Sequence, residues 1–181
     1  MMRGETIGLR ARHDDDIPVL HSELYEDVAT RSRADSRPWR PLSAAHSPFV
    51  VAGPEDDVAW FSVEELASGE LAGEAVLWGI DTHNRSAHLG LALRPAFRGR
   101  GLASDAVRTL CAYGFAVRGL QRLQLETLTD NAPMLAAATG AGFLREGTLR
   151  RAAWTYDGWA DQAVLGLLVD DWEPREKQAA Q

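Results

Sequence analysis

The stretch LGLALRPAFRGRGLASDAVRTL, residues 89–110, changes character twice. Leucines alternate with small residues up to Arg94, which is typical of a half-buried β-strand, and Pro95 prevents that strand from continuing in the middle of a sheet. An Arg-Gly-Arg-Gly corner follows, and apolar residues then return at helical spacing. The stretch therefore predicts a strand that turns sharply into a helix.

The corner has the chemistry of an anion site. The first N–H groups of a helix lack partners and its dipole adds positive charge there. Gly99 and Gly101 allow backbone to approach a ligand, and Arg98 and Arg100 can pair with phosphate oxygens. A tight turn with solvated arginines explains the same residues equally well. A dinucleotide fingerprint does not match, because Ser104 stands where it needs a third glycine or alanine, and a Walker loop would need a lysine.

Composition limits the possible partners. The 181 residues suit one domain, and 45 % hydrophobic with 25 % charged residues is ordinary for a soluble protein. A net charge of −7 disfavours nucleic acid and anionic membranes as partners, and no apolar run approaches the ~20 residues of a membrane span. The single Cys111 excludes an intrachain disulfide and suits a reducing compartment. We therefore expect a cytoplasmic protein that binds neither nucleic acid nor membrane.

The first half of the chain reads as mixed structure. Residues 6–12 predict a strand, and residues 14–29 predict one helix with apolar positions at helical spacing. Residues 30–48 are polar and broken by prolines, which predicts a long loop or an irregular helix pair. Three strands should follow, over residues 58–66, 70–82 and 86–95.

The second half alternates helices and strands. Residues 101–119 predict a helix with one apolar face, formed by Leu102, Ala106, Leu110, Tyr113 and Val117. A strand over 120–129 precedes a second helix, which should begin at the cap Asn131 and end at Gly142. Strands over 146–156 and 159–172 should form a hairpin around Asp157-Gly158. The order predicts a mixed α/β fold around one sheet.

Residues 98–103, Arg-Gly-Arg-Gly-Leu-Ala, resemble the Arg/Gln-x-x-Gly-x-Gly/Ala motif of the GNAT superfamily of acyl-CoA-dependent N-acyltransferases. HLGLALRPAFRGRGLASDAVRTLCAYGF (88–115) resembles that family's central strand, pyrophosphate loop and helix, and RLQLETLTDNAPMLAAATGAGF (122–143) its next strand and helix. REGTLRRAAWTYDGWADQAVLGLLVDDW (145–172) is similar to the ending of the RimJ/RimL-like ribosomal-protein acetyltransferases. The resemblance covers about residues 70–172, and the order of its segments makes it specific.

The resemblance implies a GNAT fold: a single mixed, mostly antiparallel sheet flanked by helices, with a splayed strand pair that holds acyl-CoA. Residues 1–172 would form one acyltransferase domain and residues 173–181 a tail. Backbone groups of Leu91, Ala92 and Leu93 would contact the pantetheine arm and the thioester, although core packing explains the same leucines. The pyrophosphate would be held beside Arg98 by Gly99, Arg100, Gly101, Leu102, Ala103 and Ser104. Asn131 would contact pantetheine as well as cap its helix, unless capping is its whole role.

Two positions depart from the RimJ/RimL-like pattern. Met134 stands where that branch commonly has a serine, a proposed proton donor, and Ala153 stands where some members have an acidic base. His88 and Glu126, on the strands that flank the expected thioester, are the candidate proton acceptors, with a rim histidine and an exposed carboxylate as the plainer readings. Tyr156 and Asp157 are weaker candidates. No Cys/His cluster has metal-ligand spacing, so no metal is expected.

We therefore expect an enzyme that moves acetyl from acetyl-CoA to a primary amine, first of all a protein or peptide N-terminus. Alternatives are a small-molecule amine as acceptor, a larger acyl donor such as succinyl, or a CoA-binding module without useful turnover. Trp39, Trp78, Trp154 and Trp159 could line an acceptor groove or a dimer surface, with core packing as the alternative. With the long hairpin they suggest a possible homodimer.

Overall fold

The computed structural model describes residues 1–51, 53 and 55–172. Within these residues, eight strands form one sheet in the order β1-β2-β3-β4-β5-β6-β8-β7, in which β5 and β6 run parallel and every other pair is antiparallel. The strands are β1 (Met2–Arg3), β2 (Ile7–Arg10), β3 (Val58–Glu65), β4 (Leu71–Asp81), β5 (Ser86–Leu93), β6 (Arg122–Leu128), β7 (Leu144–Thr155) and β8 (Gly158–Leu168). The mixed, mostly antiparallel sheet is as predicted, and the predicted tail, residues 173–181, lies outside the described residues.

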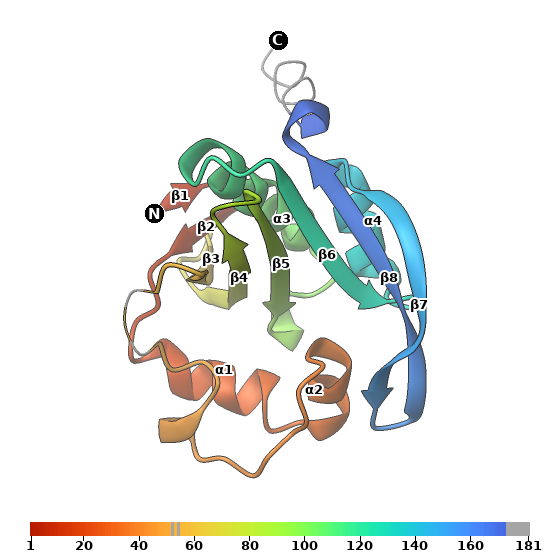
Figure 1. Cartoon of the computed structure of the whole chain (residues 1–181). Coiled ribbons are helices and arrows are strands. Elements are labelled where there is room, and N and C mark those ends of the chain that lie inside the picture. Colours follow the sequence, from red (N-terminus) through yellow and green to blue (C-terminus); the bar gives the residue numbers. More distant parts are fainter. Residues whose placement is uncertain (52, 54, 173–181) are drawn as a thin grey trace.

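The helices cover the sheet in two groups (Figure 1). They are α1 (Asp16–Leu24), α2 (Val28–Ala34), α3 (Leu102–Ala112) and α4 (Ala132–Ala141), with short 3₁₀ turns η1 (Ala44–His46) and η2 (Pro95–Phe97) and a π-helical segment η3 (Tyr113–Val117). Helices α3 and α4 pack against one another over the main core, where Leu110, Leu123 and Leu165 are buried.

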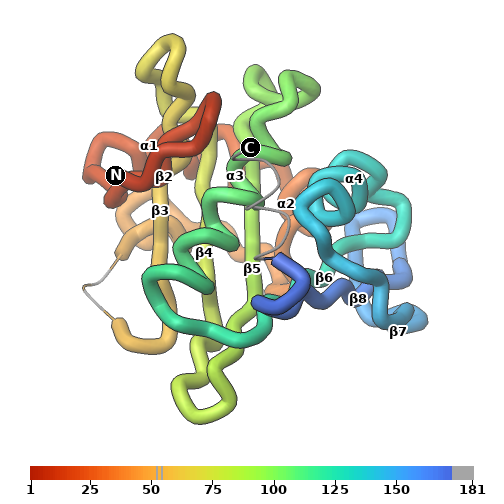
Figure 2. The backbone as a smooth tube through the Cα atoms, turned by 90° about the horizontal axis from the view of Figure 1, so that it is seen from above, coloured from red at the N-terminus to blue at the C-terminus, as the bar shows by residue number. Residues whose placement is uncertain are grey.

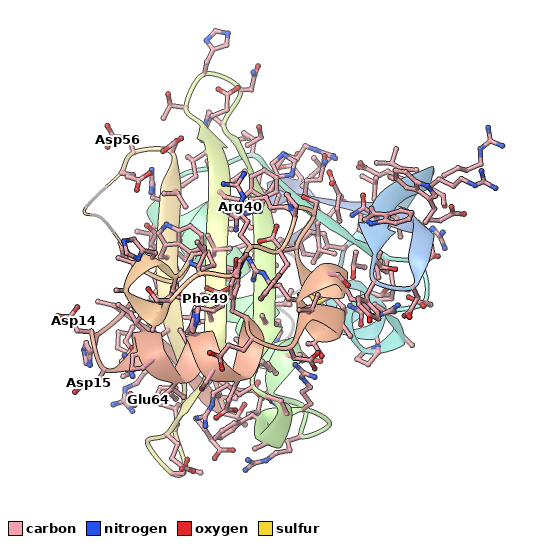
Figure 3. All side chains as sticks on the ribbon, turned by 90° about the horizontal axis from the view of Figure 1, so that it is seen from below. Asp14, Asp15, Arg40, Phe49, Asp56 and Glu64 are labelled. Atoms are coloured by element: carbon pink, nitrogen blue, oxygen red, sulfur yellow. The ribbon has the colours of Figure 1, made fainter. Side chains whose placement is uncertain are left out.

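A smaller apolar cluster joins α1 to the sheet. Leu20, Leu24, Tyr25 and Phe49 are buried together and contact Ala92 at the end of β5. Phe49 is labelled in Figure 3, in front of the central strands and beside α1. This cluster holds α1 and the following segment against one end of the sheet.

The sheet opens at its one parallel pair. Ladder pairing between β5 and β6 covers Ser86–His88 opposite Arg122–Gln124, and β5 continues without it to Leu93. Beyond this point the two strands diverge, with α2 lying below the opening (Figure 1), and Figure 2 shows β6–β8 set to one side of β5. The splayed strand pair expected from the resemblance is therefore present.

The N-terminal region differs from the prediction. The helix predicted over residues 14–29 is two helices, because Asp27 caps a new one by accepting hydrogen bonds from the N–H groups of Ala29 and Thr30 at 3.1 and 3.3 Å. Helix α2 therefore extends into the segment predicted as a loop or irregular helix pair. Strand β1 was not predicted, because two residues give no periodic signal.

The predicted apolar face of the helix after residue 101 needs one correction. Leu102, Ala106 and Leu110 are buried, but Val117 is 60 % exposed. The reason is the change from α- to π-helical geometry at Tyr113, which rotates later side chains away from the face set by an α-helical period. Two predictions farther along the chain are confirmed, because Asn131 caps α4 and Gly142 ends it with a φ of +109°. The hairpin is present, but it turns at Tyr156-Asp157, one residue before the predicted Asp157-Gly158, because Gly158 already pairs with Thr155 as the first residue of β8.

Candidate active site

A cleft of about 540 Å³ occupies the space between the diverging strands. Its walls are the backbone and side chains of β5 and β6, the segment 30–36 that includes most of α2, the glycine corner, and the start of α4. Ala153 and Gln162 of the C-terminal hairpin complete the lining. One cleft thus joins segments that are far apart in the sequence.

Most of the residues predicted to bind acyl-CoA line this cleft. They are Leu91, Ala92, Leu93, Arg98, Gly99, Ala103 and Asn131. Glu126, one of the two candidate proton acceptors, lines it as well. Arg100, Gly101, Leu102 and Ser104 are outside the lining, and Leu102 is instead a buried core residue.

The glycine corner leaves open space in front of α3. Gly99 has a φ of +71° and Gly101 a φ of +81°, and a Cβ built on either would meet no atom within 4 Å. Both values lie in the left-handed region that side chains disfavour. Because Gly101 is the N-cap of α3, the N–H groups at the start of the first helical turn, before that of Ser104, lie beside this space. The corner therefore fits an anion such as a pyrophosphate.

The two arginines of the corner have different surroundings. Arg98 lines the cleft, and its Nε donates to the carbonyl of Leu93 at 2.9 Å. Arg100 is instead paired with Glu65 of β3, at 2.5 Å between Nη2 and Oε1, and lies 5.3 Å from the centre of the Phe97 ring. Arg98 is thus placed for a ligand in the cleft, whereas Arg100 ties the corner to β3.

Asn131 is held from both sides. Its Oδ1 accepts from the N–H of Met134 at 3.4 Å, which is the capping contact, and its Nδ2 donates to Thr127 Oγ1 at 2.9 Å. Met134 and Ala153 also line the cleft. Neither side chain carries an ionisable proton, so neither supplies acid–base chemistry there.

His88 and Glu126 are brought together at the fork of the two strands. His88 Nδ1 lies 3.8 Å from Glu126 Oε1, and the histidine ring stacks on Trp78 with 4.1 Å between ring centres. Glu126 reaches the cleft, whereas His88 lies just outside its lining. The side chains are 31 % and 30 % exposed, so both groups are in reach of water.

Helix α2 forms a wall of the cleft that the sequence did not predict. Arg33 of α2 pairs with Asp130 beside α4, at 2.7 Å, and the N–H of Tyr156 donates to Ser32 Oγ at 2.9 Å. These contacts join α2 to the far side of the opening. The available signal was Asp27, a good N-cap followed by a polar helical segment.

Buried charges support this wall. Arg12 pairs with Glu74 of β4 at 3.0 Å, and burial raises the pKa of the Glu74 carboxyl even though Arg12 opposes that shift. Asp35 pairs with Arg31 and Arg37. Burial alone would raise the pKa of Asp35, but the hydrogen bonds from Arg37 and the nearby guanidinium charges outweigh it and lower the pKa.

The remaining candidates lie elsewhere. Tyr156 and Asp157 are outside the lining, as are the four tryptophans considered for an acceptor groove, Trp39, Trp78, Trp154 and Trp159. All four are exposed at the surface, by 38–64 %. Within residues 1–51, 53 and 55–172, no group of three His, Cys, Asp or Glu side chains could hold a metal ion. In that same part of the chain, no helix has the length and apolar character needed to cross a membrane.

Comparison with known proteins places this geometry in a family. Residues 6–144 match the family model described as the acetyltransferase (GNAT) domain. YdaF of Bacillus subtilis, named as a ribosomal N-acetyltransferase, is 31 % identical over 108 residues, which cover 60 % of this chain and 59 % of YdaF. The p20 protein of Bacillus licheniformis, named as an uncharacterised N-acetyltransferase, is 27 % identical over 81 % of this chain and 83 % of its own.

Two solved structures have the same fold at low sequence identity. RimL, the ribosomal L7/L12 alpha-N-protein acetyltransferase in complex with coenzyme A, has a TM-score of 0.80 at 22 % identity over 93 % of this chain and 97 % of its own. The spermidine N-acetyltransferase of Vibrio cholerae, in complex with CoA and spermine, has a TM-score of 0.79 at 20 % identity, and the match covers 93 % of this chain and 98 % of that enzyme's chain. With the family model matching more than half of the residues, this chain belongs to the GNAT family of acetyltransferases.

Proposed function

We propose that this protein transfers an acetyl group from acetyl-CoA to a primary amine, and that the amine is the N-terminus of a protein or peptide. The observation that carries the proposal is the backbone edge of β5 from Leu89 to Leu93, which continues without ladder pairing to β6 and borders a cleft that ends at an anion corner. A long ligand with amide groups in the middle and phosphates at one end suits both features.

The corner supplies the phosphate end of this site. Gly99 and Gly101 leave room for a pyrophosphate, and the N–H groups from Gly99 to Ala103 would donate to it, with Arg98 beside them. The N–H of Ser104 already donates to the carbonyl of Gly101 at 3.2 Å, so its contribution would be smaller. Arg100 would act by holding the corner through Glu65 rather than by direct contact.

The strand edge supplies the middle of the site. Backbone groups of Leu91, Ala92 and Leu93 would pair with the amides of the pantetheine arm, and Asn131 would contact the same arm from the opposite wall. Acetyl-CoA supplies an activated acyl group whose thiolate is a tolerable leaving group. Holding amine and thioester together removes much of the entropic barrier, so positioning alone contributes substantially.

Proton handling falls to Glu126 and His88. A primary ammonium must lose a proton before its nitrogen can attack, and Glu126 is the carboxylate that lines the cleft near the fork. Met134 and Ala153 provide no proton donor or base at their positions. The departing thiolate would therefore take its proton from water.

Two classes of acceptor, protein N-termini and small amines, are compared because the structural neighbours include an enzyme for each. A protein N-terminus is favoured by the RimJ/RimL-like ending of the chain and by the similarity to YdaF. A polyamine or another small amine is favoured by the carboxylates that line the cleft, namely Asp35, Glu126 and Asp130. Asp35 and Asp130 are already paired with arginines, which leaves little free negative charge for a polycation.

The test is acceptor-dependent release of the CoA thiol, measured with purified protein, acetyl-CoA and a panel of amines. The panel should contain peptides with free and with blocked N-termini, spermidine, spermine and lysine. Release with free but not blocked peptides supports the proposal, and release with polyamines alone would replace the acceptor. Binding of acetyl-CoA without release for any amine would favour a CoA-binding module. Succinyl-CoA as a second donor tests the size of the acyl group.

We also propose a homodimer that works in the cytoplasm. Trp154, Tyr156 and Trp159 are 61–72 % exposed at the tip of the C-terminal hairpin. Large aromatic side chains that are grouped on a surface in this way are typical of a protein–protein interface. Cys111, the sole cysteine, is buried in α3 and suits a reducing compartment.

A further inference from the structure

We infer that Glu126 and His88 form one proton path out of the cleft, and that Gln124 and Trp78 are positioning residues that hold its two members. The inference rests on the proposed function, because the proton in question belongs to the acceptor ammonium of that reaction. It adds an order to the two groups: Glu126 takes the proton in the cleft, and His88 passes it to water.

Glu126 is the member that faces the substrate. Its side chain lines the cleft, and its Oε1 accepts a hydrogen bond from Gln124 Nε2 at 2.7 Å. Gln124 is two residues earlier on β6, so its side chain lies on the same face of the strand. The amide therefore fixes the direction of the carboxylate without neutralising it.

His88 is the member that faces water. Its ring stacks on Trp78 with 17° between the ring planes, which fixes its orientation, and 31 % of the side chain is exposed. The ring lies outside the cleft lining, so Glu126 rather than His88 borders the space proposed for the acceptor. Protons that arrive on this ring can pass to water.

His88 and Glu126 approach one another without forming a hydrogen bond. His88 Nδ1 is buried and has no hydrogen-bond partner among the residues that the structure describes. It points toward Glu126 Oε1 at 3.8 Å, which is too long for a hydrogen bond and short enough for a small side-chain rotation to close. A buried nitrogen without a partner costs free energy, and a protonated Glu126 would supply the missing donor. Proton transfer to Glu126 thus creates the hydrogen bond that carries the proton onward.

The strand register explains why these groups meet at this point. His88 lies opposite Gln124 in the last ladder pair before β5 and β6 diverge. Glu126 is two residues after Gln124 on β6, so its side chain lies on the same face of the strand. It is therefore the first residue of β6 on that face to line the open cleft. The path runs from the opening, across the last ladder pair, to the surface beside Trp78.

The step balances without a further reactant. An N–H bond of the ammonium breaks as an O–H bond forms on Glu126, and that O–H bond breaks as an N–H bond forms on His88 Nδ1. The ring releases a proton to water and returns to neutral. In the transfer itself a C–N bond forms and a C–S bond breaks. The nitrogen then loses a second proton to water, and the thiolate gains one.

The experiment uses two acceptors that differ in how much they need deprotonation. A peptide N-terminus has a pKa of about 7.7–8.0 and a lysine-type amine one of about 10.4, so only the former is substantially neutral at neutral pH. We expect Glu126→Gln to lower kcat/KM by roughly 10²–10⁴-fold for the lysine-type amine and by less for the N-terminus, mainly through kcat. The CoA-induced thermal shift should stay unchanged.

His88 is tested by removal and chemical rescue. His88→Ala should lower kcat for the lysine-type amine, and added imidazole should restore part of it, because the exposed site beside Trp78 admits a free ring. His88→Phe keeps an aromatic ring for Trp78 to stack on and should resist rescue. The matched control is His83→Ala, which removes an exposed histidine in the turn after β4 and should leave kcat unchanged with or without imidazole.

The positioning residues are tested by conservative replacement. Trp78→Ala and Gln124→Met should lower kcat without raising KM for the acceptor, and Trp78→Phe should recover most of the loss. Because the path is a series, the double variant of His88→Ala and Glu126→Gln should be no slower than Glu126→Gln alone.

Three outcomes would overturn the inference while leaving the proposed function intact: His88→Ala within about threefold of wild type for both amines, no rescue by imidazole, or losses that multiply in the double variant. Absence of acceptor-dependent thiol release by the wild-type protein would instead overturn the proposed function, and the inference with it.

Discussion

Replacing Gly99 by valine is expected to abolish the binding of CoA while leaving the fold intact. Gly99 lines the cleft with a φ of +71°, and a Cβ there would point into open space. The Cβ of the valine therefore meets no protein atom within 4 Å, and its branched side chain would enter the volume proposed for the pyrophosphate. Gly69 offers a matched control, because its φ is +72°, it also has no atom within 4 Å of a Cβ, and it lies in the turn between β3 and β4.

The magnitudes follow from backbone strain and ligand linkage. A left-handed residue with a side chain costs about 1–2 kcal/mol, so both variants should melt roughly 2–8 °C below wild type. CoA at about 100 times its Kd stabilises by about 2.7 kcal/mol, which raises Tm by roughly 5–11 °C in wild type and in Gly69→Val. A hundredfold loss of affinity in Gly99→Val leaves about 0.4 kcal/mol, or roughly 1–2 °C.

The assay is thermal denaturation of the three proteins over a series of CoA concentrations. Equal melting temperatures without ligand for the two variants confirm that the strain is matched. The reasoning is refuted if Gly99→Val shows the same CoA-dependent shift as Gly69→Val. In that case the corner is a turn between β5 and α3 and the phosphate binds elsewhere.

Three further predictions concern stability and assembly. Burial opposes ionisation of Asp16, but hydrogen bonds from Arg10, the His13 N–H and Ser62 outweigh it and hold the pKa of Asp16 well below its ordinary value. That stabilisation is complete above the ordinary aspartate pKa of about 3.9 and is lost as pH falls further. The Asp16→Asn variant should therefore have a lower melting temperature than wild type at pH 7, and its melting temperature should fall less steeply as the pH is lowered into the acid range. Asp105→Ala should cost about 1–3 kcal/mol in urea titrations, because it leaves the buried N–H of Ile7 and that of Thr6 without their acceptor at 3.0 and 2.7 Å. Light scattering should give the mass of a dimer that Trp154→Ser with Trp159→Ser reduces to a monomer, and a monomeric wild type would contradict the proposed assembly.

Local patterns along the chain were enough to predict much of the fold. The alternation before Pro95, the glycines after it and the cap at Asn131 each act over a few residues, so strand, corner and helix were predictable without tertiary information. The break between α1 and α2 was missed because Asp27 sits inside a continuing apolar period. The π-helical turn at Tyr113 was missed for a similar reason, since a single wider turn leaves the composition unchanged.

The parts of the site that depend on local backbone geometry were predictable from the sequence. The parts that depend on contacts between side chains far apart in the sequence were not. Glycine positions and the edge of β5 follow from the sequence between residues 89 and 103. The pairing of Arg100 with Glu65 depends on where β3 lies relative to the corner, and no local pattern contains that distance. The same holds for the wall formed by α2 and for the approach of His88 to Glu126, which requires the parallel register of β5 and β6.

The short ladder between β5 and β6 also has a consequence for how the molecule unfolds. Within the described sheet, three residue pairs join strands β1–β5 to strands β6–β8, besides the packing of α3 against α4 and the contacts of α2 with Asp130 and Tyr156. The two halves should therefore open as separate cooperative units, with different rates of amide hydrogen exchange. A ligand that bridges the cleft would touch both units and make them open together. Slower exchange at Val63 and Leu165, which are buried in strands of opposite halves, would then report occupancy of the cleft at a distance.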